Sequence, residues 1–236
     1  MKFAYLVLAI AGAGFIVGCS NPTRSRDLAN PNVSSVTIAQ QVCSSCHGMT
    51  GTAVSPNFPN LAGQTPAYLV AQLNGFKSHG RQDPAGFEYM WGISRSLTDE
   101  QITGLAAYYA NQQPARQPIE GDKSRMAAGK MIFEGGLPAQ KVPACTACHG
   151  AAGVGNETSP RISGQHADYI IKQLSVFQRT NQRPEGAVMK NVAHELTRDD
   201  IANVAAYVQA LPNRYHNVMC LWCSHDKWCE VAKCAV

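Results

Sequence analysis

The pentapeptide pattern Cys-x-x-Cys-His occurs twice in this chain of 236 residues, and the second copy begins 102 positions after the first. Residues around the two copies repeat at nearly the same distance, which indicates a duplicated domain with small changes in loop length. The sequence therefore predicts two tandem domains. The copies are Cys43-Ser44-Ser45-Cys46-His47 and Cys145-Thr146-Ala147-Cys148-His149, and the flanking matches include Leu61-Ala62-Gly63-Gln64 with Ile162-Ser163-Gly164-Gln165, Tyr68, Gln72 and Phe76 with Tyr169, Gln173 and Phe177, and Leu97-Thr98 with Leu196-Thr197.

This pentapeptide is the attachment signature of c-type haem. Its two thiols form thioethers with the porphyrin, and the adjacent histidine becomes an axial ligand of the iron. A single copy could also be a redox-active or zinc-binding cysteine pair, but zinc would need further ligands at matching spacing. We therefore expect two covalently bound haem c groups. The predicted attachment residues are Cys43, Cys46, Cys145 and Cys148, with His47 and His149 as iron ligands.

Each half of the chain predicts helices and no convincing strand. Thr65-Pro66 opens a middle helix, because proline suits the first helical position. Thr98-Asp99-Glu100-Gln101 is a capping-box pattern that predicts the start of a last helix, and its counterpart begins at Thr197. The predicted fold class is therefore all-α. The inner faces of the two last helices are predicted to be Ile102, Leu105, Ala106 and Tyr109 in the first half, and Ile201, Val204, Ala205 and Val208 in the second.

The second axial ligand of each iron decides whether a haem carries electrons or binds other molecules. Methionine is the soft ligand that raises the potential. Met90 and Met189 each lie seven residues before the Leu-Thr pair that opens the last helix, so we expect both to bind iron. A histidine replacing methionine in one domain remains an open alternative. The candidate histidines, none of which has a counterpart in the other half, are His79, His166, His194, His216 and His225.

Two further pairs of residues are candidates for a supporting role around the haems. Pro59 and Pro160 follow the haem motifs by similar distances, so their carbonyls could accept the free N–H of the ligand histidine and fix its tautomer. Arg81 and Arg183 follow the two middle helices and could pair with haem propionates. Placement on the surface is the alternative for both arginines.

The N-terminus predicts export and lipid anchoring. Lys2 precedes an uncharged apolar run from Phe3 to Val17, shorter than the about 20 residues that span a bilayer. Gly18-Cys19 ends the run in the manner of a bacterial lipoprotein signal, so we expect lipid on Cys19 and a periplasmic protein tethered to the inner or outer membrane. An uncleaved anchor helix is the alternative. The formal charge of +4 shows no basic run, so nucleic acid is not an expected partner.

A short C-terminal segment holds the remaining cysteines. Export favours two disulfides among them, in any of three connectivities, over a metal site. A third haem is not expected, because His225 lies one residue too far from Cys220 and Cys223. The cysteines of this tail are Cys220, Cys223, Cys229 and Cys234.

Together these residues resemble the dihaem class I cytochromes c of the cytochrome c4 family. The resemblance rests on Phe58-Pro59-Asn60-Leu61-Ala62-Gly63-Gln64, on the segment from Val142 to Gly150, on both methionine loops and on both closing helices. It implies two tandem cytochrome c domains, two haems ligated by His and Met, and electron transfer in the periplasm between quinol-oxidising complexes or other donors and a terminal oxidase. The lipid signal and the cysteine-rich tail depart from the family pattern.

The predicted activity is that of an electron carrier and not an enzyme. Two alternatives remain: a dihaem oxidoreductase with one labile iron ligand, acting as a peroxidase or sulfur-compound dehydrogenase, and a haem subunit docked to a larger respiratory complex. The expected organisation is a signal peptide at 1–18, a lipidated flexible tether at 19–35, cytochrome c domain 1 at 36–114, a linker at 115–121, cytochrome c domain 2 at 122–212 and the cysteine-rich tail at 213–236.

Overall fold

The computed structural model describes residues 26–84, 86–115 and 122–211. The predicted signal peptide, Cys19, the linker beyond Ala115 and the four tail cysteines lie outside the described residues, as do His216 and His225. Those predictions therefore remain expectations. Across the described ranges, no helix combines the length and apolarity needed to cross a membrane.

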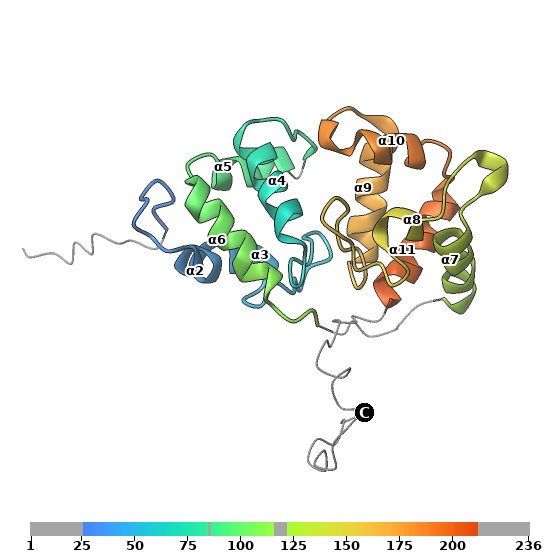
Figure 1. Cartoon of the computed structure of the whole chain (residues 1–236), viewed down its shortest axis with the longest axis horizontal. Helices are drawn as coiled ribbons and strands as arrows, with labels where there is room; N and C mark the ends of the chain where they lie inside the picture. Colours follow the sequence, from blue (N-terminus) through green and yellow to red (C-terminus); the bar gives the residue numbers. More distant parts are fainter. Residues whose placement is uncertain (1–25, 85, 116–121, 212–236) are drawn as a thin grey trace, which may run out of the picture.

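The described part of the chain is helical, as predicted, and its only β-type pairing is one isolated bridge between Leu137 and Val142. Figure 1 shows two helical halves side by side, with α4 of the first half and α9 of the second at the centre. The first half contains α2 (Ser35–Ile38), η1 (Ala39–Cys43), α3 (Ser44–His47), α4 (Pro66–Lys77), η2 (Gly86–Met90), α5 (Trp91–Ser94) and α6 (Asp99–Ala110). The second contains α7 (Lys123–Gly135), η3 (Pro138–Gln140), α8 (Thr146–His149), α9 (Ala167–Arg179), η4 (Pro184–Gly186), α10 (Ala187–Ala193) and α11 (Arg198–Ala210).

Local sequence explains where the longer helices begin. Pro66 takes the first turn of α4, where its missing N–H costs nothing. Thr98 and Thr197 close capping boxes at α6 and α11, each accepting from the backbone N–H three residues on. Both predicted helix starts are confirmed, and all eight residues predicted for the inner faces of these helices are buried.

Each half has its own hydrophobic core, which is the packing expected of two domains. In the first core, Ile38 of α2 and Leu69 of α4 are buried together with the inner face of α6. In the second, Phe133 of α7 and Phe177 of α9 are buried with the inner face of α11. The first and last helices of each half pack against each other, α2 against α6 and α7 against α11.

A glycine makes the crossing of α7 and α11 possible. A Cβ on Gly129 would lie 2.0 Å from the backbone oxygen of Asn203, far inside van der Waals contact. We expect Gly129→Ala to lower the free energy of unfolding by about 1–3 kcal/mol, because α7 must move off α11. Denaturant unfolding followed by circular dichroism measures the change. Gly135 of the same helix has no atom near its missing Cβ, so Gly135→Ala is the matched control, and equal effects of the two substitutions would contradict the packing argument.

Candidate functional site

The two Cys-x-x-Cys-His segments fold into equivalent short helices. Cys43 and Cys145 immediately precede α3 and α8, which end at His47 and His149. The glycine after each histidine reverses the chain with positive φ, 74° at Gly48 and 79° at Gly150. A Cβ on Gly48 would meet the backbone oxygen of Thr52 at 2.2 Å, so this turn requires glycine.

None of the four cysteines of these segments is in a disulfide, so their thiols can form the thioethers of haem c. Among the described residues, no group of three or more His, Cys, Asp or Glu side chains could hold a metal ion. A zinc site built on either cysteine pair thus finds no further ligands within the described ranges.

Both histidines are buried and held by the proline carbonyls named from the sequence. Nδ1 of His47 lies 2.9 Å from the oxygen of Pro59, and Nδ1 of His149 lies 2.8 Å from that of Pro160. Burial lowers the pKa of both imidazoles, and the hydrogen bond to the proline carbonyl offsets only part of this effect. Each ring is therefore neutral at pH 7, donates Nδ1–H to the carbonyl and leaves Nε2 available as a ligand.

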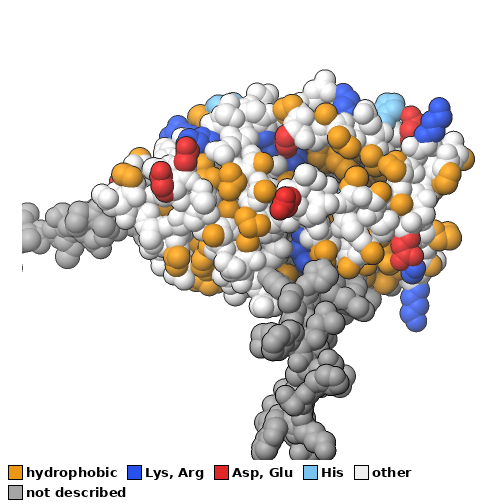
Figure 2. All heavy atoms as spheres, viewed as in Figure 1, with side chains coloured by type: hydrophobic (Ala, Val, Ile, Leu, Met, Phe, Trp, Pro, Cys, Tyr) orange, Lys and Arg blue, Asp and Glu red, His pale blue; other side chains and the backbone are white. Residues whose placement is uncertain are grey.

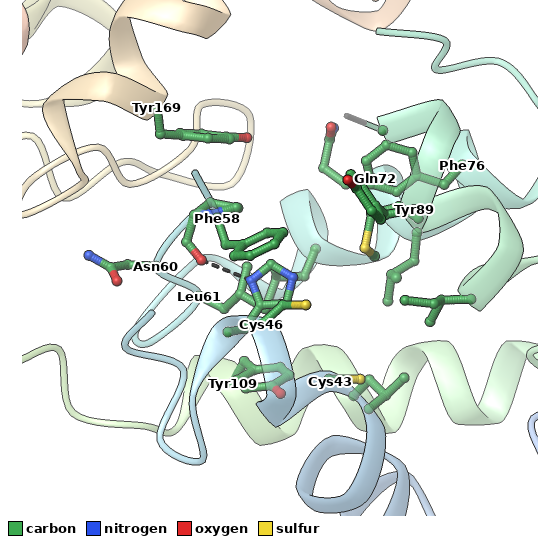
Figure 3. A pocket seen from close by; sticks show the side chains of 18 of the residues that line it. Cys43, Cys46, Phe58, Asn60, Leu61, Gln72, Phe76, Tyr89, Tyr109 and Tyr169 are labelled. Atoms are coloured by element: carbon green, nitrogen blue, oxygen red, sulfur yellow. Dashed lines mark hydrogen bonds between the residues drawn. The ribbon is translucent and has the colours of Figure 1, made fainter. Parts of the chain in front are cut away.

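A large, mostly apolar cavity opens beside His47 in the first domain. Together with the open space at its mouth, it measures about 1190 Å³. Figure 3 shows Cys43, Cys46 and Phe58 on its wall, with Tyr169 reaching toward it from α9 of the second domain. The lining residues also include Leu61, Leu69, Phe76, Tyr89, Met90, Ile93, Leu105 and Tyr109, and the polar groups Gln72, Arg81, Asp83, Gln165 and Gln173.

The two predicted methionine ligands lie in different local structures. Met90 lines the cavity of the first domain together with His47, and it lies at the end of η2, a π-type turn of the kind often found at functional sites. Met189 lies in α10 and packs against the core of the second domain.

The competing histidines make other contacts. His79 packs against Trp91, with 4.4 Å between the two ring centroids, and is not among the residues that line the cavity. His166 lies with Nε2 2.9 Å from the carbonyl oxygen of Ala53 in the other domain. The side chain of His194 is largely exposed and lies beside Glu195.

Arg81 and Arg183 are buried, so the alternative of surface placement is wrong for both. They lie where the two domains meet, each stacked over the phenylalanine of its own middle helix, Phe76 or Phe177. Each guanidinium reaches across the interface: Arg81 donates to Gln173 at 3.4 Å, and Arg183 donates to Gln72 at 2.9 Å.

The carboxylate partners of these arginines were missed at the sequence level. Nε of Arg81 donates to Asp83 at 2.6 Å, and Nε of Arg183 donates to Glu185 at 2.9 Å. The signal was present as an acidic residue two positions after each arginine. Asp83 is completely buried, whereas the side chain of Glu185 is 33% exposed. Burial by itself raises the pKa of Asp83, but the hydrogen bond and charge of Arg81, with the charge of Arg183, hold it below its ordinary value.

These groups fit a haem in the first domain. The wall is mostly apolar and carries the paired thiols, and a neutral imidazole and a thioether of the wall would suit the two kinds of iron ligand. Two buried arginines offer positive charge that would suit carboxylates such as the propionates. The second domain repeats the thiols, the imidazole with its carbonyl partner, the methionine and the arginine.

Comparison with known proteins agrees with this assignment. The cytochrome c family model matches residues 36–113 and again residues 126–212. Cytochrome c4 of Pseudomonas aeruginosa is 37% identical over 174 residues, covering 72% of this chain and 84% of that protein. A thiosulfate dehydrogenase electron acceptor of Stutzerimonas stutzeri (strain A1501) is 31% identical over 173 residues, covering 72% of this chain and 78% of that protein.

Solved structures show the same likeness. The crystal structure of reduced recombinant cytochrome c4 from Pseudomonas stutzeri superposes with a TM-score of 0.69 at 34% identity, covering 76% of this chain and 100% of that one. The repeated motifs, the paired helical domains and these matches lead to one conclusion: the chain belongs to the cytochrome c family, as a protein of the cytochrome c4 type with two cytochrome c domains and two covalently bound haem c groups.

Proposed function

We propose that this electron-transfer protein works in the periplasm, tethered by lipid on Cys19, and carries electrons from respiratory donors such as a quinol-oxidising complex to a terminal oxidase or reductase. The first haem would be held by Cys43 and Cys46 with His47 and Met90 on iron. The second would be held by Cys145 and Cys148 with His149 and Met189. Each haem, when bound, supplies reversible one-electron chemistry at its iron.

The observation that carries this proposal is the cavity in which a neutral, hydrogen-bonded His47 and the thioether of Met90 both form part of the wall. With histidine and methionine on the iron, no coordination position is left for a substrate, so the task of the protein is to hold the ligands and exclude water. Arg81 and Arg183 are proposed to pair with propionates at the buried interface.

The outer surface supports contact with protein partners through apolar side chains. Tyr89 and Val188 immediately precede the two predicted methionine ligands, and both are exposed, as is Phe87. On the face shown in Figure 2, charged side chains are scattered singly and in small groups between apolar ones. Such a surface suits brief docking with little electrostatic steering, and a lipid tether would instead supply a high local concentration.

A ferric absorption spectrum with an intact-mass measurement tests the proposal on the full-length protein. The methionine-to-iron charge-transfer band should account for two haems, and the mass should show two haems and one lipidated N-terminus. A high-spin haem, or one that readily binds cyanide or carbon monoxide, would contradict the simple carrier.

A second candidate is favoured by the thiosulfate dehydrogenase electron acceptor among the relatives. The donor would then be a sulfur-compound dehydrogenase, with the haem sites unchanged. Stopped-flow kinetics separate the two donors. The rate at which the ferric protein is reduced by a thiosulfate dehydrogenase with thiosulfate is compared with its rate of reduction by a quinol-oxidising complex.

Direct oxidation of thiosulfate by the protein alone would indicate instead that it is an enzyme with one labile iron ligand. Stoichiometric copurification with an oxidase or dehydrogenase in mild detergent would indicate a docked subunit.

A further inference from the structure

Two buried glutamines form hydrogen bonds across the domain interface, one from each domain. Gln64 belongs to the first domain and Gln165 to the second, at matching places just before α4 and α9. Gln64 is only 5% exposed and Gln165 only 6%. Gln165 accepts from the backbone N–H of Asn60 at 2.8 Å and donates to the carbonyl of Asn60 at 3.0 Å. Gln64 accepts from the N–H of Arg161 at 2.7 Å and donates to its carbonyl at 2.9 Å.

Each glutamine binds the residue that comes immediately after a proline. The carbonyl of that proline accepts the hydrogen bond of the ligand histidine. The carbonyl of Pro59 and the N–H of Asn60 belong to one planar peptide group. His47 donates to the oxygen of that group, and Gln165 accepts from its N–H, so one peptide lies between the histidine of one domain and the glutamine of the other. The same holds for His149, the Pro160–Arg161 peptide and Gln64.

Each glutamine is itself fixed in place. Its side-chain oxygen also accepts from the backbone N–H of the next residue, Thr65 at 2.9 Å or His166 at 3.1 Å. The amide is thus held at both ends, with little freedom to rotate away from the peptide across the interface. A peptide that donates through its N–H is polarised, and its carbonyl becomes a stronger acceptor.

We propose that Gln64 and Gln165 are positioning residues that act across the domain interface, each tuning the haem of the opposite domain through the proline carbonyl behind its histidine. This inference rests on the proposed function, in which His47 and His149 are axial ligands. A stronger carbonyl acceptor makes the imidazole a more basic ligand and favours ferric iron. Loss of a glutamine should therefore raise the reduction potential of the haem in the other domain.

The experiment measures the potential of each haem separately in the full-length holoprotein. Redox titration is followed by the NMR signals of the ferric haem methyl groups, which Met90→Ala and Met189→Ala assign to one domain each. Gln165→Leu should raise the ferrous-to-ferric ratio of the first haem at fixed potential by roughly threefold or more, or about 28 mV for one electron, and leave the second haem unchanged. Gln64→Leu should do the reverse.

Two further variants separate this role from loosening of the interface. Gln165→Glu keeps an oxygen that accepts from Asn60, so the potential of the first haem should not rise. His166→Leu removes a contact between domains that ends on the carbonyl of Ala53 and not on either proline peptide, and should leave both potentials unchanged.

Several results would overturn the proposal. The potential could shift in the haem of the substituted domain, shift equally in both haems, or not shift at all. The same rise in potential with Gln165→Glu as with Gln165→Leu would also overturn it. If the wild-type protein lacks two sets of low-spin haem signals, the proposed function itself fails. A wild type with both sets but no crossed shift refutes only the inference.

Discussion

Replacing Met90 by alanine is expected to halve the ferric methionine-to-iron charge-transfer absorbance while both haems stay attached. The substitution removes the only thioether among the side chains that line the cavity of the first domain, and the thioether favours ferrous iron. The potential of that haem should therefore fall, and its iron should bind cyanide or carbon monoxide more readily. Absorption spectra and a redox titration measure these changes.

The second domain and an exposed methionine provide the comparisons. Met189→Ala should remove the other half of the band, and the double variant should remove all of it. Met131, which is 71% exposed on α7, is the control, and Met131→Ala should leave the spectrum as in the wild type. An unchanged band in Met90→Ala would place the ligand elsewhere, and His79→Ala would then be the next variant to examine.

Replacing Arg81 by alanine is expected to lower the free energy of unfolding by about 3–5 kcal/mol at pH 7, because it removes the ion-pair partner of a fully buried Asp83. Arg183→Ala is the matched control. It loses comparable hydrogen bonds to glutamines, but Glu185 is 33% exposed and can be hydrated, so the cost should be smaller. Denaturant unfolding of the holoproteins measures both.

The pH dependence tests whether charge is the cause. The pKa of Asp83 is lowered in the folded protein, so its ionised form stabilises the fold above the ordinary value of about 3.9, and this contribution is lost as the pH falls below that value. In Arg81→Ala, protonation of Asp83 removes the unpaired charge. The difference between wild type and variant should therefore shrink on acidification, and a difference that is constant with pH would show that packing alone is responsible.

Much of the fold could be predicted because its signals are local. The capping boxes at Thr98 and Thr197, the proline at the start of α4 and the helical spacing of buried residues each depend on neighbours along the chain. The duplication strengthened the capping-box signal by giving it twice. The signal peptide, the lipid on Cys19 and the tail disulfides stay predictions, since they lie outside the described residues.

The groups that act between the domains could not be predicted in the same way. Arg81 could equally have been a surface residue, and nothing near it in the sequence required contact with Gln173. The roles of Gln64 and Gln165 depend on partners that lie across an interface, about one hundred positions away in the sequence.

The sequence by itself thus determined the number of domains and the helical class. It also determined the residue types that bind haem, because Cys-x-x-Cys-His places all three groups within five consecutive residues. Only the tertiary structure decided what surrounds each haem site. Burial lowers the pKa of His47, and Asp83 and glutamines accept hydrogen bonds from the buried Arg81. A glutamine of the other domain binds the peptide group behind each histidine. These properties arise from desolvation and from pairing between distant segments, and both exist only once the two domains have packed together.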